Sequence, residues 1–158
     1  MNKKNVKMFK QDKDFGDFYE CELLKYFNTN PQLHGKITKT KDKFNVVDYV
    51  NSDWVCELKS RRISINDFET IMIGKNKLLL AENDTTTRQF RFYFVLKEGT
   101  FYWDFRDQNV EGIDPDYFFG MGGRCDRGKD ERKQCGYIFA SSLTLLTDTI
   151  YYGLAPML

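Results

Sequence analysis

The chain has 158 residues, of which 41% are hydrophobic and 16% aromatic, so it is long and apolar enough for one globular domain and is not intrinsically disordered. Its 24 lysines and arginines nearly balance its 23 aspartates and glutamates, giving a net charge of +1; net charge therefore argues neither for nor against a nucleic-acid partner. The charged N-terminus resembles no secretory signal, and no stretch approaches the roughly 18 apolar residues of a membrane span. We expect an intracellular protein (cytoplasm or nucleus) that has no membrane partner.

The first predicted element is a helix over Asp14–Asn28, whose apolar residues recur at helical spacing. Asn30-Pro31 ends it, and the polar residues 1–13 before it are expected to form a frayed arm or a basic arm that touches phosphate. Glu20 lies at the margin of the apolar stripe. It either reaches solvent or points into a site.

Three strands are predicted next: a lysine-rich edge strand at Gly35–Lys41, then a hairpin of Phe44–Val50 and Trp54–Ser60. The two-residue period of a strand places Glu57 and Lys59 on one face. An even loop, such as a turn of two residues, sets Asp48 opposite Glu57, whereas an odd loop without a bulge separates them. Two facing carboxylates repel each other, and a bound cation would relieve that repulsion.

A second helix is predicted over Ser64–Glu82, with Ser64 as N-cap, Asp67 completing an acidic capping box, and Ile63 and Phe68 forming a hydrophobic staple. Its Lys75 and Lys77 are either solvated or in contact with phosphate.

Arg88–Leu96 and Thr100–Phe105 come next as an aromatic hairpin. The glycine-rich and charged stretch Arg106–Gly136 is expected to be irregular, with Arg124 and Arg127 available to phosphate. Tyr137–Thr147 is expected to be a strand that runs into a helix.

The cysteines offer a different metal site. Cys21, Cys56, Cys125 and Cys135 include no C-x-x-C pair, and without a secretory signal we expect no disulfides. Cys125 and Cys135 with His34, the only histidine, would be a zinc set, but the tight ligand spacing of most zinc sites is absent. His34 is expected on the surface.

The pair Glu57-x-Lys59 is not specific by itself, since residues 131–133 repeat the same spacing in a polar loop. Its context adds specificity, because the pair lies in an apolar strand, nine residues after Asp48 in the preceding strand, and a helix that carries Glu20 comes before both.

This order of residues and elements resembles the PD-(D/E)XK nuclease superfamily, the restriction endonuclease-like enzymes. The match covers about Phe15 to Phe105, and Gly16–Glu20 is similar to the first helix of the phage and archaeal Holliday-junction resolvases. Val47 stands where the motif has proline. The resemblance implies an α/β domain over 1–158: an αβββαβ core at about 14–106, with a mixed central sheet flanked by helices, and a C-terminal loop and helix addition at 107–158.

The resemblance also implies a Mg²⁺- or Mn²⁺-dependent endonuclease that hydrolyses DNA phosphodiester bonds, as a junction resolvase or a restriction-like enzyme. Asp48, Glu57, Glu20 and the Leu58 carbonyl would hold the metal, and Lys59 would orient or activate the water. Residues that would contact DNA are Lys75, Lys77, Arg61, Arg124 and Arg127. Homodimers are common in the superfamily, although no dimer surface can be identified in the sequence.

Three alternatives stay open. The charged residues of the hairpin form an ordinary salt-bridge cluster; the same fold binds nucleic acid without cutting it; or the substrate is RNA, with His34 as an extra ligand for Mn²⁺. The composition, rich in lysine, asparagine, phenylalanine and tyrosine, suits an AT-rich genome such as a viral one.

Overall fold

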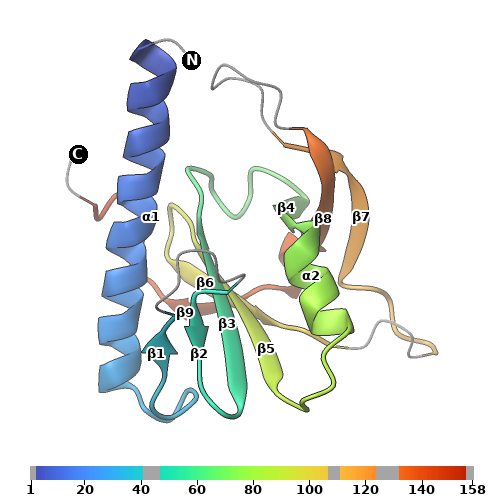
Figure 1. Cartoon of the computed structure of the whole chain (residues 1–158). Helices are drawn as coiled ribbons and strands as arrows, with labels where there is room; N and C mark the ends of the chain where they lie inside the picture. The colour runs from blue at the N-terminus through green and yellow to red at the C-terminus, as the bar shows by residue number, and fades with distance from the viewer. Residues whose placement is uncertain (1–2, 41–46, 107–110, 124–131, 156–158) are drawn as a thin grey trace.

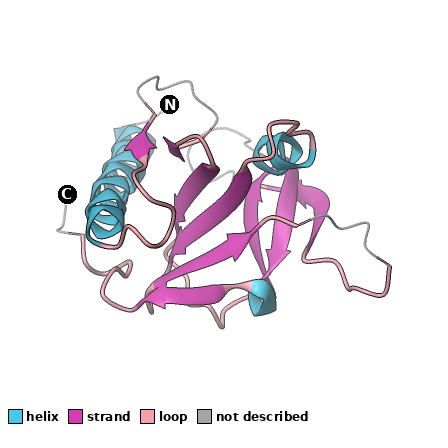
Figure 2. Ribbon diagram, turned by 90° about the horizontal axis from the view of Figure 1, so that it is seen from below, coloured by secondary structure: helices cyan, strands magenta, loops and turns pink. Residues whose placement is uncertain are grey.

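The computed structural model describes residues 3–40, 47–106, 111–123 and 132–155, and they form an α/β protein with two sheets. The six-stranded sheet has the order β1-β2-β3-β5-β6-β9, and a smaller sheet has the order β4-β8-β7 (Figures 1 and 2). The elements are α1 (Lys3–Thr29), β1 (Thr38–Lys39), β2 (Tyr49–Val50), β3 (Trp54–Ser60), β4 (Thr70–Gly74), α2 (Lys75–Glu82), β5 (Gln89–Val95), β6 (Thr100–Asp104), β7 (Tyr117–Gly122), β8 (Lys133–Phe139), a 3₁₀ turn (Ala140–Ser142) and β9 (Thr144–Thr147).

Helix α1 is much longer than predicted. It begins at Lys3, so the prediction of a frayed arm at residues 1–13 is wrong from that residue on, and its N-terminal half rises beyond the end of the sheet (Figure 1). The extension contains no proline, and the i,i+4 ion pair of Lys13 with Asp17, 3.0 Å from Nζ to Oδ2, supports it. Further along, Tyr19, Leu23 and Phe27 are buried at a spacing of four residues.

The large sheet confirms the strand predicted at Trp54–Ser60, whereas the strands predicted at Gly35–Lys41 and Phe44–Val50 are shorter than expected: Asp48 lies outside β2, and residues 44–46 lie outside the described residues. Strands β1, β2 and β3 form an antiparallel meander with β1 at the edge, and β5 and β6 form the predicted hairpin. Strand β5 runs parallel to β3, from Trp54 opposite Gln89 to Ser60 opposite Val95. A parallel neighbour requires a crossover connection, which here is the segment of β4 and α2.

The two faces of the large sheet bury different apolar clusters. Cys56, Leu58 and Tyr93 pack with α1 on one face. Val55 and Phe92 pack on the other face with α2 and the small sheet. This alternation along β3 and β5 results from the two-residue period of a strand. The protein therefore has three layers: α1, the large sheet, and α2 with the small sheet.

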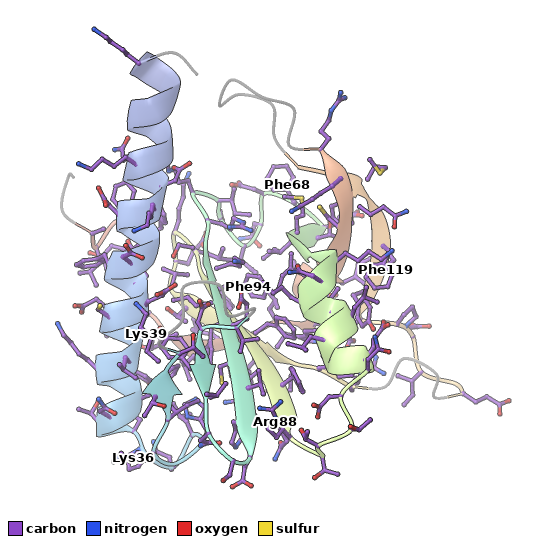
Figure 3. The ribbon with its side chains drawn as sticks, in the orientation of Figure 1. Lys36, Lys39, Phe68, Arg88, Phe94 and Phe119 are labelled. Carbon is purple, nitrogen blue, oxygen red and sulfur yellow. The ribbon has the colours of Figure 1, made fainter. Side chains whose placement is uncertain are left out.

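The prediction of one helix over Ser64–Glu82 is right only from Lys75 on, where α2 begins, and wrong before it. Ser64 and Asp67 do form a local turn, in which the Asp67 carboxylate accepts the Ser64 backbone N–H at 2.8 Å. The turn leads into strand β4, and Phe68 is 60% exposed rather than part of a staple (Figure 3). The β-branched run Thr70–Gly74 buries alternate residues, which is strand periodicity, and it pairs with β8.

The C-terminal third is more regular than predicted. Strands β7 and β8 form an antiparallel pair within the stretch expected to be irregular. Tyr137–Thr147 continues as the end of β8, the 3₁₀ turn and strand β9, so the predicted helix there is wrong. Strand β9 pairs with β6 and thereby completes the large sheet. The glycines of this stretch suggest a loop, yet Gly136 lies inside strand β8. A glycine is needed at this position because a Cβ there would overlap the Leu78 side chain.

Candidate active site

The turn between β2 and β3 has the register that the sequence leaves open. Tyr49 pairs with Cys56 and Val50 with Val55. The loop is the two-residue Ser52-Asp53 turn, closed by the Asn51 side chain, whose Oδ1 accepts the backbone N–H groups of Asp53 and Trp54 at 2.8 and 2.7 Å. The paired register ends at Tyr49, and Asp48 lies just before it, with its backbone bonded to Cys56 rather than paired with Glu57.

Asp48 lies at a bend just before β2, and its backbone is held from both sides. Its N–H donates to the Cys56 carbonyl at 3.1 Å, and its carbonyl accepts the Thr40 N–H at 2.8 Å. The carboxylate turns toward β3, where Oδ2 accepts the backbone N–H of Leu58 at 2.7 Å. Asp48 is therefore fixed directly beside the Glu57-x-Lys59 pair.

Glu57 is a buried carboxylate with two lysines on one of its oxygens. Its side chain is 3% exposed, and Oε1 lies 2.8 Å from Nζ of Lys59 and 3.2 Å from Nζ of Lys77. Lys77 comes from α2, on the face of the sheet to which the period of β3 directs Glu57. Oε2 has no hydrogen-bond partner among the described residues. A buried carboxylate oxygen without a donor is costly.

Glu20 reaches the site from α1. Its Oε2 lies 2.7 Å from Nζ of Lys39 on β1, which Figure 3 labels beside α1. Burial raises the pKa of Glu20, and the neighbouring Asp48 carboxylate, with which it interacts directly, raises it further against the pull of Lys39. Burial and the Glu57 charge likewise raise the pKa of Asp48. Glu20 and Asp48 are thus two neighbouring carboxylates, each costly to ionise in the presence of the other's charge and of the surrounding burial.

Two clefts meet at Lys59. The first, about 420 Å³, lies between α1 and the end of β3 and is lined by Glu20, Leu58 and Arg61 among others. The second, about 320 Å³, lies between the end of β3, α2 and the small sheet. Its described lining carries four cations and no carboxylate: Lys59, Arg61, Lys77 and Lys133. A surface of this charge suits a phosphate backbone.

The structure places the residues predicted to contact DNA in three different ways. Arg61 and Lys77 line the second cleft. Lys75 is turned away from it, since its Nζ donates to Gln134 Oε1 at 2.7 Å and lies 5.4 Å from the Phe119 ring centroid. Arg124 and Arg127 lie outside the described residues.

The zinc alternative and the surface position of His34 are not supported. His34 is buried, its Nε2 lies 2.9 Å from the Tyr93 hydroxyl, and its ring packs on Phe27. That places it in the cluster on the α1 face, whereas Cys135 lies on β8 and lines the second cleft. Cys125 is outside the described residues.

The carboxylates fit a divalent cation in their chemistry but are not arranged around one. Mg²⁺ and Mn²⁺ prefer carboxylate and carbonyl oxygen, and Asp48, Glu57 and Glu20 supply it, with one buried oxygen lacking a donor. Among the described residues, no group of three or more acidic, histidine or cysteine side chains is already placed to hold a metal. Coordination therefore requires the Glu57 carboxylate to turn away from Lys77 or Lys59.

Two contacts of the site are not predicted by the sequence. Lys77 is predicted as a DNA contact, but it also pairs with Glu57. Lys39 is predicted only as part of an exposed edge strand, but it pairs with Glu20. The position of Lys77 depends on α2 beginning at Lys75, and no local pattern marks that start. The alternating lysines of the edge strand are the available signal for Lys39.

Comparison of the chain with protein-family models, with curated proteins and with solved structures found no match. Within the described part of the chain, no helix combines the length and apolar character that crossing a bilayer needs. The case for a function therefore depends on the geometry of the site.

Proposed function

We propose that the protein is a divalent-metal-dependent endonuclease that hydrolyses phosphodiester bonds in DNA, built on the restriction endonuclease-like PD-(D/E)XK plan. One observation carries the proposal. The Asp48 carboxylate is bonded to the backbone of Leu58, between the buried Glu57 and Lys59, and Lys59 lines two clefts, the second of which is lined by cations. Acids and a lysine in this order, beside a surface suited to phosphate, are the parts that metal-assisted phosphodiester hydrolysis needs.

The order of elements supports the same plan. Along the chain, α1, β1, β2, β3, α2 and β5 have the αβββαβ order, and β5 runs parallel to β3. Strand β4 is an insertion before α2 that joins the small sheet rather than the central one. Asp48 comes just before β2, and Glu57 and Lys59 lie in the C-terminal half of β3.

Asp48, Glu57 and Glu20, with the Leu58 carbonyl, would hold Mg²⁺ or Mn²⁺. When bound, the ion supplies an acidified water and neutralises charge on the phosphate. The protein's own groups do the rest. The Leu58 N–H fixes the Asp48 carboxylate, and the ammonium of Lys59 orients the attacking water or stabilises charge on the phosphate. By resemblance, the products carry a 5′-phosphate and a 3′-hydroxyl.

A second candidate is a nucleic-acid-binding module that does not cut. The pairing of Glu57 with both Lys59 and Lys77 favours it, because the lysines already neutralise the carboxylate that the metal would need. The raised pKa values of Glu20 and Asp48 favour the nuclease, because an ordinary salt-bridge cluster would not place together two acids whose ionisation burial penalises.

Incubation with supercoiled plasmid, a four-way DNA junction and RNA of matched sequence, each with Mg²⁺, Mn²⁺ or EDTA, tests the proposal. We expect DNA cleavage with either metal, none with EDTA, and loss of cleavage in Asp48→Asn, which keeps an acceptor for the Leu58 N–H. Binding of DNA without cleavage in any metal would favour the binding module. Cleavage of RNA alone would contradict the assignment to DNA.

A further inference from the structure

The small sheet carries an aromatic surface that the proposed cleavage site does not use. By strand register, Tyr137 lies between Met72 and Phe118. Phe118 stacks on Tyr137, with ring centroids 5.3 Å apart and planes at 20°, and Phe139 lies 5.6 Å from Phe118. Phe118 is 46% exposed. Tyr137 and Phe139 are partly buried beside it. We call Phe118, Tyr137 and Phe139 the aromatic strip; aromatic rings that reach the surface together on one face indicate a binding surface.

Two glycines leave room for the Tyr137 ring. A Cβ at Gly120 would lie 3.3 Å from Cε2 of Tyr137, and a Cβ at Gly122 would overlap its hydroxyl. The ring therefore lies along β7, over the glycines, and its hydroxyl donates to the Met121 carbonyl at 2.7 Å. The ring is thus held in place along the sheet, and Tyr137 is partly exposed there beside the more exposed Phe118.

The aromatic strip borders the cation-lined cleft. Alternation along β8 places Lys133 and Cys135 on the same face as Tyr137, and both line the second cleft with Met72. Lys59 lines that cleft too. A path thus runs from the proposed cleavage site, past cations, onto stacked rings. Cations beside aromatic rings suit a strand whose phosphates and unstacked bases are both available.

We propose that the β4-β8-β7 sheet binds a single-stranded segment of DNA, with phosphates in the second cleft and bases stacked on the aromatic strip. Continuous duplex does not satisfy this surface, because its bases already stack on one another. The inference rests on the proposed function and narrows it to substrates that contain unpaired nucleotides beside the cut, such as flaps, gaps or branched DNA.

Fluorescence anisotropy in EDTA tests the inference apart from cleavage. The probes are a labelled single-stranded DNA of about 12 nucleotides, which is within the site sizes that such surfaces cover, its duplex, an RNA of the same sequence, and an abasic strand of equal length. We expect the single-stranded DNA to bind about tenfold more tightly than the abasic strand, which corresponds to about 1.4 kcal/mol, and more tightly than the duplex.

Phe118→Ala tests the strip directly, since Phe118 is half exposed and its truncation leaves the core in place. We expect this variant to bind the single-stranded and abasic probes about equally, and Phe118→Tyr to retain the difference. Leu145→Ala removes an apolar side chain of similar exposure, 53%, from β9 in the other sheet and is the matched control. Equal binding of both probes by the wild-type protein would overturn the inference, as would tighter binding of the RNA or the duplex.

The two proposals fail separately. Tighter binding of single-stranded than of abasic DNA in EDTA, with no cleavage in any metal, would contradict the proposed nuclease but support the single-strand surface. Metal-dependent cleavage, with no effect of Phe118→Ala on the difference between the two probes, would support the nuclease but contradict the single-strand surface. Sedimentation of the same variant tests whether a second copy of the protein occupies the aromatic strip instead of DNA. If Phe118→Ala turns a dimer into a monomer without changing DNA binding, the strip is a subunit interface and the inference is wrong.

Discussion

The Oδ2 atom of Asp48 accepts the backbone N–H of Leu58 at 2.7 Å, which joins the acid before β2 to the residue between Glu57 and Lys59. This bond takes the place of a ladder hydrogen bond at the bend. It holds the carboxylate where its pKa responds to the charges of both flanking side chains, Glu57 and Lys59, so residues that follow one another in the sequence also interact in space.

Because Lys59 and Lys77 share the Glu57 carboxylate, substitutions at Glu57 and Lys77 should have non-additive effects on the free energy of unfolding. Glu57→Gln leaves Lys59 and Lys77 without their shared counter-charge, and both are partly shielded from water, with side chains 31% and 15% exposed. We expect urea denaturation to show a loss of about 1–3 kcal/mol, less than for a fully buried pair. Adding Lys77→Met should recover part of that loss. A double variant that shows the plain sum of the two single effects would contradict the coupling.

Replacing glycine by alanine should have opposite effects on stability at two positions, Gly136 and Gly16. Gly136→Ala forces a Cβ into Leu78 in the core and should cost about 1–3 kcal/mol by overpacking. Gly16→Ala lies in α1 with no neighbouring atom within 4 Å and should stabilise by about 0.5–1 kcal/mol. Thermal unfolding of both variants checks the pair. Equal effects would contradict the packing described for β8 against α2.

Gly16→Ala also tests the first cleft, which Gly16 lines. If substrate backbone approaches α1 closely there, the stabilised variant should cut more slowly than the wild-type protein. Unchanged cleavage would place the substrate in the second cleft alone.

Acid should destabilise the protein through His34. Burial, together with the charge of Arg91, lowers the pKa of His34 from 6.5 to about 4. The unfolded chain takes up a proton near its ordinary pKa while the folded chain does not, so the stability from neutral His34 is full above 6.5 and is lost as pH falls toward 4. His34→Gln, which does not titrate, should show a shallower fall in its urea midpoint over that window. Parallel curves for the two proteins would exclude His34 as the cause.

Local patterns are sufficient to predict the hairpin that carries the site. Asn51 closes the two-residue turn with its own side chain. The register itself stays open in the sequence, because Val55–Leu58 is buried on both faces of the sheet and a slip would not expose a clearly polar face. The two-residue period of a strand is enough to place Glu57 and Lys59 on one face.

The small sheet is not predictable in the same way. The Ser64 turn forms as its capping pattern predicts, but the strand after it depends on Thr70–Gly74 pairing with β8, more than 60 residues later in the chain. That distant partner outweighs the weak helical preference of the segment. The Lys77–Glu57 pair depends in turn on where the strand stops and α2 starts.

Lys59 and Lys25 offer a matched comparison for the proposed chemistry. Each places Nζ on a glutamate, Lys59 at 2.8 Å from the buried Glu57 and Lys25 at 2.9 Å from the more exposed Glu22. The most direct measurement is the single-turnover rate of plasmid cleavage in Mn²⁺ by Lys59→Met and Lys25→Met, with EDTA as the blank. We predict a loss of at least about a hundredfold for Lys59→Met, in line with removing a charge that acts in the transition state, and a near wild-type rate for Lys25→Met. Equal rates for the two variants, or cleavage that persists in EDTA, would contradict the nuclease site.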